Sequence, residues 1–315
     1  RFVYGNDARS LLKAMQENPR VLEILLTIFS GSQFLTEILL KEPENLQILT
    51  RHESIAKQKS HAEMLALFAN CTEINDPTEF ADLIRRVHKR ELLRIGAGDL
   101  LGILDLTTVT HQLSNLADAT AQTCLEFAAQ STHRDPSNFV VLGMGKLGGQ
   151  ELNYSSDIDL LFLQTNDDID HTRLTQVLID LLTRVTSEGF LYRVDVRLRP
   201  WGRDGALVTS VDGYANYLRQ HAKLWEKQAL IKARPIAGNL ALGDKFLSEV
   251  ETLIYNEDPE TIRRNVLGMK TRTEEILRER GKEWGQVKLG AGSIRDVEFV
   301  IQYLQLLHGR EYPKL

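Results

Sequence analysis

The chain is poor in the features that mark secreted, membrane-spanning and zinc-binding proteins. It has only two cysteines, Cys71 and Cys124, far apart in the sequence, so we expect no disulfide framework and a reducing, cytoplasmic compartment. No apolar run reaches the ~20 residues that a membrane-spanning helix needs, and the N-terminus does not resemble a signal peptide. The eight histidines lack the spacing of a zinc site. These absences predict a cytoplasmic protein with no membrane partner.

An excess of positive charge is missing as well. The chain has 38 Lys and Arg against 43 Asp and Glu, which gives a net charge of −5 at pH 7. A general nucleic-acid surface needs a basic excess to neutralise phosphates, so the composition argues against a nucleic-acid partner. A small basic pocket remains compatible with it. The length of 315 residues predicts two domains, or one domain with a helical appendage, and the initial Arg1 suggests a fragment of a larger protein.

Helical periodicity dominates the chain from Asn6 to about Gln130. The apolar run after Pro19 ends at Gly31, and Ser32 is placed to cap the next helix. A turn-rich linker is expected near residue 135. We therefore predict three consecutive regions: residues 1–135 helical, residues 136–240 with a small sheet, and residues 241–315 helical with a short strand around 287–289 that returns to the active site.

Three short strands are predicted in the central region. Residues 139–142 form a buried apolar run that ends in glycines, and residues 157–163 form a second strand. Residues 192–198 alternate strictly between apolar and polar types, which is typical of a strand with one buried face. A helix with apolar positions between 174 and 185 connects the second strand to the third. The expected fold class is α+β.

The segment 143–163, GMGKLGGQELNYSSDIDLLFL, carries the strongest chemical signal. A glycine turn after a strand lets backbone amides approach a phosphate closely. Asp157 and Asp159 are two residues apart, so on a strand their side chains project to the same face. Two adjacent carboxylates are costly without a cation between them, and Mg²⁺ prefers oxygen ligands. The segment therefore predicts a divalent metal beside a phosphate.

Asp195 is the candidate for a third carboxylate. It lies between Val194 and Val196 in the alternating strand, so it shares the opposite face with Arg193 and Arg197. In that position it would complete the metal site and act as base for the nucleophile. A lone Asp-x-Asp pair is often only a turn or strand end, whereas a glycine turn, a spaced pair and a third strand aspartate together indicate catalysis.

This arrangement resembles the nucleotidyltransferase superfamily typified by DNA polymerase beta, with Lys146 where Gly or Ser is usual. Four segments together resemble the glutamine synthetase adenylyltransferase/adenylyl-removing enzyme family: GMGKLGGQELNYSSDIDL, YRVDVRLRPWGRDGALV, WEKQALIKARPIAGN and VKLGAGSIRDVEFVIQ. The resemblance runs from about Leu92 to Leu315. It implies an α+β fold with a polymerase-beta-like nucleotidyltransferase core, a small mixed sheet with helices, flanked by helical regions.

The resemblance also implies the roles of the site residues. Asp157, Asp159 and Asp195 would hold Mg²⁺ or Mn²⁺ and carry catalysis. The residues implied to bind phosphate or nucleotide are Gly145, Lys146, Gly149, Ser156, Arg197, Arg199 and Arg295. Arginine offers a rigid donor fork for phosphate, but a salt-bridged strand face is an equal alternative for Arg197 and Arg199. Likewise, Arg295 and Glu298 could form a helix-surface ion pair. Lys232 and Arg234 could contact a phosphate or the partner protein, or could lie on a helix face.

Family members hold two tandem halves that act on a tyrosine of glutamine synthetase. One half adds AMP from ATP, and the other removes it by phosphorolysis, taking inorganic phosphate and releasing ADP. The removing half is favoured by four segments, MGKLGG, ELN, SSDIDL and KLGAG, although Ser293 replaces a usual Gly. Two alternatives stay open: the ATP-dependent adding half, and a non-catalytic module that binds a PII-type signalling protein and glutamine synthetase.

Overall fold

The computed structural model describes residues 19–282 and 284–312, and in them the chain is α+β, as predicted. The helix expected to begin at Asn6 starts outside the described residues. The chain divides into two compact units, one formed by residues 1–136, 149–158 and 173–194, the other by residues 137–148, 159–172 and 195–315. Each unit is thus assembled from three separate segments, whereas the three predicted regions are consecutive in sequence.

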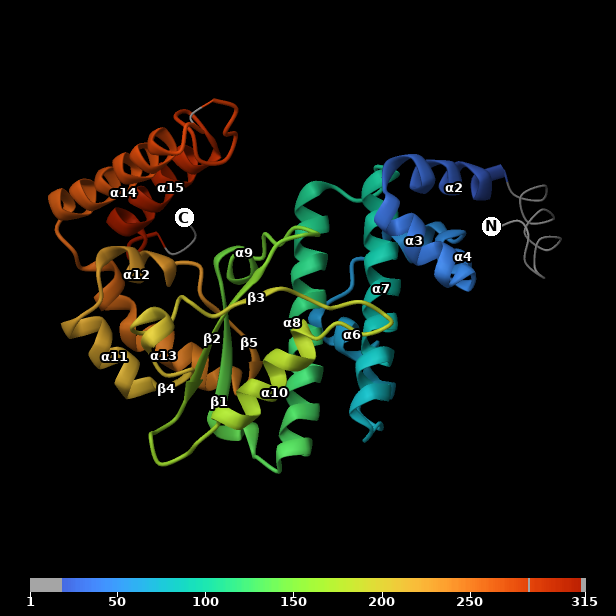
Figure 1. Cartoon of the computed structure of the whole chain (residues 1–315), viewed down its shortest axis with the longest axis horizontal. Coiled ribbons are helices and arrows are strands. Elements are labelled where there is room, and N and C mark those ends of the chain that lie inside the picture. Colours follow the sequence, from blue (N-terminus) through green and yellow to red (C-terminus); the bar gives the residue numbers. More distant parts are fainter. Residues whose placement is uncertain (1–18, 283, 313–315) are drawn as a thin grey trace. The chain divides into compact units, whose positions relative to one another are not determined.

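The first unit is mainly helical (Figure 1). Helix α2 spans Pro19–Gly31, and the Ser32 side chain caps α3, Gln33–Lys41, by accepting from the Leu35 amide, as predicted. Short elements follow: η1 Pro43–Asn45, α4 Leu46–Leu49, α5 His52–Ala56, α6 His61–Ala66 and η2 Ala69–Cys71. Two long helices, α7 Pro77–Leu100 and α8 Leu106–Thr132, pack against each other, and residues 173–183 of α10, Thr172–Thr183, belong to the same unit.

Apolar faces of α2 and α3 pack on α7 and form one hydrophobic cluster of this unit. Ile24, Ile28 and Leu39 are fully buried there. The approach is close because α7 has a glycine at position 96, where a Cβ atom would lie 2.6 Å from the Leu35 Cδ1 atom. The helical stripes read from the sequence therefore face a core, as expected.

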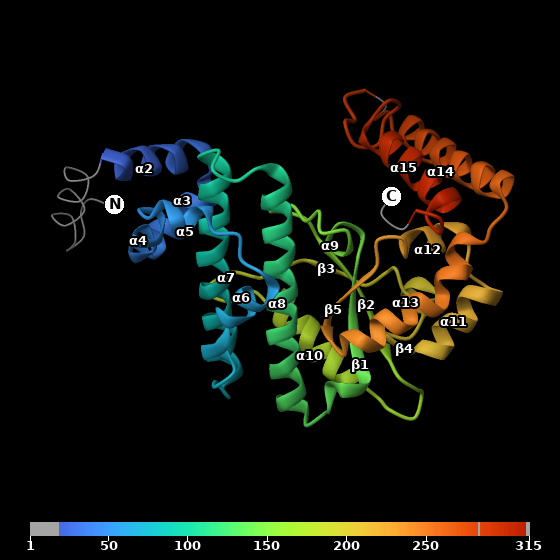
Figure 2. The ribbon, with the colours of Figure 1, turned by 180° about the vertical axis from the view of Figure 1, so that it is seen from behind.

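The second unit holds most of a five-stranded sheet with the order β3-β2-β1-β5 and with β4 beside β2 (Figure 2). The strands are β1 Phe139–Met144, β2 Ile158–Gln164, β3 Val194–Asp195, β4 Val208–Ser210 and β5 Arg234–Gly238. β1 runs antiparallel to both β2 and β5, and β4 runs parallel to β2. All six residues of β1 are buried, so the predicted apolar strand is confirmed.

Helices complete the second unit. They are α9 Gly145–Gly148, α11 Val211–Gln220, α12 Leu224–Ala229, α13 Leu240–Tyr255, α14 Pro259–Glu279 and α15 Ile294–His308, with 3-10 turns η3 Pro136–Asn138 and η4 Gly202–Asp204. Apolar side chains of α11 and α13 pack with those of β1, and α14 runs beside α15 (Figures 1 and 2). Within the described ranges, no helix combines the length and apolar character needed to cross a bilayer.

Two strand predictions were wrong. The strand expected over residues 192–198 shrinks to Val194–Asp195, because the Arg197 amide donates to the Asp195 carboxylate at 2.9 Å and turns the chain. The strand expected around 287–289 is a turn, in which the Gly290 amide donates to the Gln286 carbonyl at 3.0 Å. Strands β4 and β5 were not predicted.

Candidate functional site

The glycine turn after β1 is fixed by close backbone contacts. A Cβ atom at Gly148 would lie 2.0 Å from the Lys232 carbonyl oxygen, so only glycine fits there. The Arg234 guanidinium then braces the turn, donating to the Leu147 carbonyl at 3.2 Å and to the Gly148 carbonyl at 3.3 Å. Because Arg234 begins β5, the sheet itself positions the turn.

Asp159 lies directly beside this turn. It is a half-buried residue of β2, and its register partner on β1 is Met144. Gly145 has a φ of +54°, and a Cβ atom there would lie 2.8 Å from the Asp159 Oδ2 atom. The carboxylate therefore occupies the space that a side chain at 145 would need. The structure thus brings together two of the predicted site residues, the glycine of the turn and one aspartate.

Asp157 belongs to the first unit and pairs with an arginine. Its carboxylate accepts from the Arg193 Nε atom at 2.5 Å, with both side chains more than half exposed. Arg193 also donates to the Ser155 carbonyl at 2.6 Å, and its own carbonyl accepts from the Ile158 amide at 2.9 Å. The residues just before β2 are therefore held against the residues just before β3.

Asp195 is paired in a similar way within the second unit. Its carboxylate accepts from the backbone amide of Arg197 at 2.9 Å and from the Arg197 guanidinium Nε atom at 2.8 Å. This hydrogen bonding lowers the pKa of Asp195 below its ordinary value, with a further Coulombic contribution from Arg203. Asp195 therefore stays ionised to a lower pH than a free aspartate does.

Arg199 directs its donors to backbone rather than to open space. It donates to the carbonyls of Val196 at 2.7 Å, Gly205 at 3.1 Å and Arg203 at 3.1 Å. These bonds close the loop that follows β3. A phosphate contact by Arg199 stays a prediction, and it would require at least one of these bonds to be exchanged.

The remaining predicted residues differ in how they are held. Lys146 is half-buried in α9, and its ammonium has no partner among the residues that the structure describes. Ser156 is half-buried in a turn closed by its amide, which donates to the Asn153 carbonyl at 3.2 Å, and Gly149 is half-buried after α9. Lys146 could therefore bind an anionic ligand without first breaking an existing bond.

Arg295 lies in the first turn of α15, and its guanidinium sits over the Phe299 ring, 5.9 Å from the centroid. In the described part of the chain it forms no ion pair with Glu298. The neighbouring Asp296 instead anchors this end of α15 to α14, accepting from Lys270 Nζ at 2.6 Å. Arg295 is thus available for an anion, and its phosphate role stays a prediction.

The carboxylates suit a divalent cation by chemistry, since Mg²⁺ and Mn²⁺ prefer oxygen ligands. Across residues 19–282 and 284–312, no group of three or more His, Cys, Asp or Glu side chains is arranged to hold a metal ion. Asp157 lies in one compact unit, and Asp159 and Asp195 lie in the other. The Asp159 carboxylate packed against Gly145 has the chemistry of a metal ligand, and both the phosphate contact of the glycine turn and the full three-carboxylate set stay predictions.

Two arginines matter more than the sequence reading suggested. Arg193 is the partner of Asp157, whereas the sequence predicts it only as a neighbour of Asp195 on the strand face. Arg234 was weighed as a phosphate contact or a helix-face residue, and the structure gives it a bracing role on the glycine turn. The alternation around Asp195 did contain a signal for Arg193, because alternate residues share one face. The role of Arg234 required knowledge of β5.

Comparison with known proteins places the chain among relatives of one family. The family described as glutamate-ammonia ligase adenylyltransferase matches residues 22–249. A bifunctional glutamine synthetase adenylyltransferase/adenylyl-removing enzyme from Idiomarina loihiensis is 34% identical over 96% of this chain and 35% of its own length.

Relatives with the same name occur in other bacteria. The protein from Shewanella loihica is 33% identical over 95% of this chain and 34% of its own length. The protein from Mycobacterium tuberculosis is 31% identical over 96% of this chain and 32% of its own length. The chain therefore spans about a third of the length of the curated relatives it matches.

Proposed function

Because the chain belongs to the glutamate-ammonia ligase adenylyltransferase family, we propose that it is a metal-dependent nucleotidyltransferase that acts on an adenylylated tyrosine of glutamine synthetase. The observation that carries this proposal is the packing of the Asp159 carboxylate against Gly145 at the start of the glycine turn. This packing supports the proposal because a carboxylate at that position could hold a metal ion next to backbone that a phosphate can approach. The sheet around it would be a polymerase-beta-like core.

The reaction we propose is removal of AMP by phosphorolysis. An oxygen of inorganic phosphate forms a bond to the AMP phosphorus, the bond from phosphorus to the tyrosine oxygen breaks, and the products are ADP and tyrosine. The MGKLGG, SSDIDL and KLGAG segments support this direction over ATP-dependent addition. As a dianion near neutral pH, phosphate needs little help from a base. The chain therefore contributes mainly positioning and charge.

Asp157, Asp159 and Asp195 would hold the Mg²⁺ or Mn²⁺ ions, which supply positive charge that offsets the charge on the equatorial phosphoryl oxygens. Lys146, whose ammonium has no partner in the described structure, would bind the incoming phosphate. Arg197 would exchange its bond to Asp195 for one to a phosphoryl oxygen. The backbone amide of Arg197 would keep its bond to Asp195 during this exchange and hold the carboxylate in place.

A direct assay tests the proposal. Adenylylated glutamine synthetase, Mg²⁺ and inorganic phosphate are mixed with the chain, and ADP release is measured. Asp159→Asn should lower the rate by about a hundredfold or more, since it removes charge that acts at the reacting phosphorus. Asp168→Asn, at an exposed carboxylate after β2, is the matched control and should leave the rate unchanged. Circular dichroism verifies that both variants fold.

The alternatives give different results in the same assay. Incorporation of AMP from ATP into unmodified glutamine synthetase, without ADP release, would identify the adding half and keep the site. If the well-folded chain neither releases ADP nor incorporates AMP, and if it does not bind nucleotide in a metal-dependent way, it would be a non-catalytic module. Such a module would act by binding glutamine synthetase and a PII-type protein in the cytoplasm, and a binding assay with each partner would show it.

A further inference from the structure

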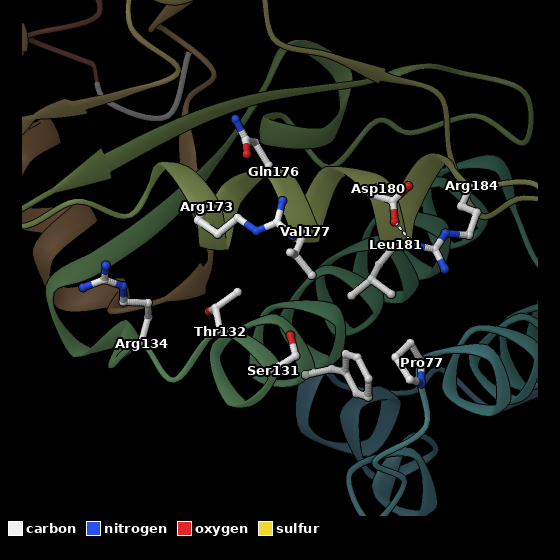
Figure 3. A pocket seen from close by; sticks show the side chains of 11 residues that line it. Pro77, Ser131, Thr132, Arg134, Arg173, Gln176, Val177, Asp180, Leu181 and Arg184 are labelled. Atoms are coloured by element: carbon white, nitrogen blue, oxygen red, sulfur yellow. Dashed lines mark hydrogen bonds and ion pairs between the residues drawn. The ribbon is translucent and has the colours of Figure 1, made fainter.

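A cavity of about 440 Å³ lies in the first unit, apart from every predicted site residue. Its walls are the end of α8 with Arg134 and the length of α10, with Pro77 of α7 at one edge. Figure 3 shows Arg173, Val177 and Leu181 from α10 on one side and residues from the end of α8 on the other. Its size suits a small organic molecule rather than a bare ion.

The charge of the cavity is opposite to that of the protein. Three arginines line it against one aspartate, although the whole chain carries a net charge of −5. Arg184 is paired with that aspartate, Asp180, one turn away on α10. The guanidiniums of Arg134 and Arg173 have no hydrogen bond or ion pair within the part of the chain that the structure describes. Two unpaired positive charges therefore border one hollow.

Backbone geometry fixes where both arginine-bearing segments lie. His133 ends α8 in the left-handed conformation, with a φ of 52°, and the Arg134 amide donates back to the Ala129 carbonyl at 3.0 Å. The end of α10 is anchored by the buried Arg85, which donates to the Leu181 carbonyl at 3.0 Å and to the Gly189 carbonyl at 2.8 Å. The cavity is thus framed by anchored helix ends rather than by loose loops.

The lining also offers an apolar floor and a neutral polar group. Phe127 is largely buried and stacks on Phe80 with the ring centroids 4.0 Å apart, and Leu181 is buried beside the cavity. The side-chain amide of Gln176 has no partner among the described residues. This combination matches a ligand that has an anionic group at one end and an organic body at the other.

We infer that this cavity binds a small phosphorylated organic anion. The phosphoryl group would accept hydrogen bonds from Arg134 and Arg173, whose planar donor forks match phosphate oxygens. The organic body would lie over Phe127, Val177 and Leu181. Because α10 follows the strand of Asp159 and precedes that of Asp195, the bound anion would contact the helix that joins the two in sequence.

Chemical protection of the unmodified chain tests this inference. Arginines are modified with phenylglyoxal in EDTA, and peptide mass spectrometry measures modification at each site. AMP, as the probe, should protect Arg134 and Arg173 several-fold and leave Arg86, an exposed arginine of α7, unprotected. Adenosine, which lacks the phosphoryl group, should protect neither, and inorganic phosphate should protect less than AMP. Equal modification with and without AMP at all three positions would overturn the inference.

Variants give a second readout. Equilibrium dialysis in EDTA, which suppresses metal-dependent binding elsewhere, measures the affinity for AMP. Changing Arg134→Gln together with Arg173→Gln should weaken binding by about tenfold or more, because each charge-assisted hydrogen bond contributes more than a neutral one. Arg86→Gln is the matched control. Unchanged affinity in the double variant, or protection by an acidic peptide but not by AMP, would also overturn the inference, and neither outcome bears on adenylyl transfer.

Discussion

At Gly145 the chain takes a left-handed backbone conformation directly beside the carboxylate of Asp159. Two requirements coincide at this residue. A positive φ is strained for any residue with a side chain, and the space for a Cβ atom is filled by the carboxylate. Sequence reading anticipated a glycine turn near two aspartates, but it could not tell which aspartate the turn would touch.

Changing Gly145→Ala separates these two requirements. The Cβ atom would displace Asp159, and a displacement of about 1 Å at a reacting centre costs on the order of a hundredfold in rate. We expect a loss of that size in ADP release, measured with adenylylated glutamine synthetase. Gly102→Ala is the control, since Gly102 has a φ of +66° with nothing within 4 Å of its Cβ position. Because both positions have a positive φ, both variants should lose about 1–2 kcal/mol of stability. Only Gly145→Ala adds a steric clash, so equal rates of ADP release in the two variants would refute the steric explanation.

His88 gives the first unit a defined response to pH. Its Nε2 atom lies 2.8 Å from the Tyr192 hydroxyl, and burial, with help from Arg85 and Lys89, lowers its pKa to about 3. The unfolded chain takes up a proton at this histidine near pH 6.5. The folded chain excludes that proton until about pH 3, so stability should fall as the pH drops between these values.

Urea unfolding between pH 7 and pH 4 measures this response. Replacing His88→Gln keeps a hydrogen-bonding group for Tyr192 and removes the titration. The slope contributed by one histidine is at most about 1.4 kcal/mol per pH unit, so the difference between the original chain and the variant should change by up to about 3 kcal/mol over that range. His111→Gln, at an exposed position of α8, should leave the profile unchanged. A variant curve parallel to the original would contradict the assignment.

At the scale of elements, the sequence predicted the strands that consist of a continuous run of apolar residues. β1 was expected over residues 139–142 and β2 over residues 157–163, and both strands form within two residues of those limits. β5, Arg-Pro-Ile-Ala-Gly, was missed because Pro and Gly argue against a strand, and the pairing with β1 contains a register shift at Ile236 of β5. β3 was overextended because alternation does not reveal that Asp195 captures the Arg197 amide.

The site followed the same division. Spacing predicted Asp157 and Asp159 as a pair on one strand, whereas β2 begins at Ile158 and includes only Asp159. Alternation predicted Asp195 with its neighbouring arginines, and the roles of all three aspartates stay predictions. Tertiary contacts decided the rest: Arg193 pairs with Asp157, and Arg199 binds the carbonyls of its own loop. Such partners are separated by loops whose path no local pattern specifies.

Helices α7 and α8 are joined by a buried charged network rather than by apolar contacts alone. Arg94, 1% exposed, donates to the Glu91 carboxylate at 2.5 Å, to the Gln112 side chain at 2.8 Å and to two carbonyls before α6. Lys59 completes the network with a 2.5 Å ion pair to Glu91. A network of this kind is costly to break because each remaining charge loses its partner.

We therefore expect Arg94→Met to lower the free energy of unfolding by about 3–5 kcal/mol, with urea denaturation as the measurement. Arg90→Met is the matched control, because Arg90 lies on the same helix, is exposed and has no partner in the described structure. It should change stability by less than about 0.5 kcal/mol. A similar small loss in both variants would show that Glu91 is well solvated without Arg94.

At the scale of the whole molecule, the chain passes between its two units five times, near residues 136, 148, 158, 172 and 194. All three tryptophans, Trp201, Trp225 and Trp284, fall in the second unit. Tryptophan fluorescence therefore follows that unit alone, while circular dichroism follows both.

This distribution allows a test of cooperativity with the Arg94→Met variant, whose change lies in the first unit. Because the units share so many crossings, we expect them to unfold together, so the fluorescence midpoint in urea should shift as far as the dichroism midpoint. A fluorescence transition that stays in place while the dichroism transition moves would show that the units unfold independently.

The five crossings have a consequence for a broken chain. A single cut near residue 168 gives two pieces, and each piece carries segments of both units. Separating the pieces would remove residues 173–194 from the first unit and divide the core of the second, so the nicked protein should migrate as one species under native conditions and separate only in denaturant. The same interleaving makes the chain a natural candidate for fragment complementation, in which two separately produced halves restore one another.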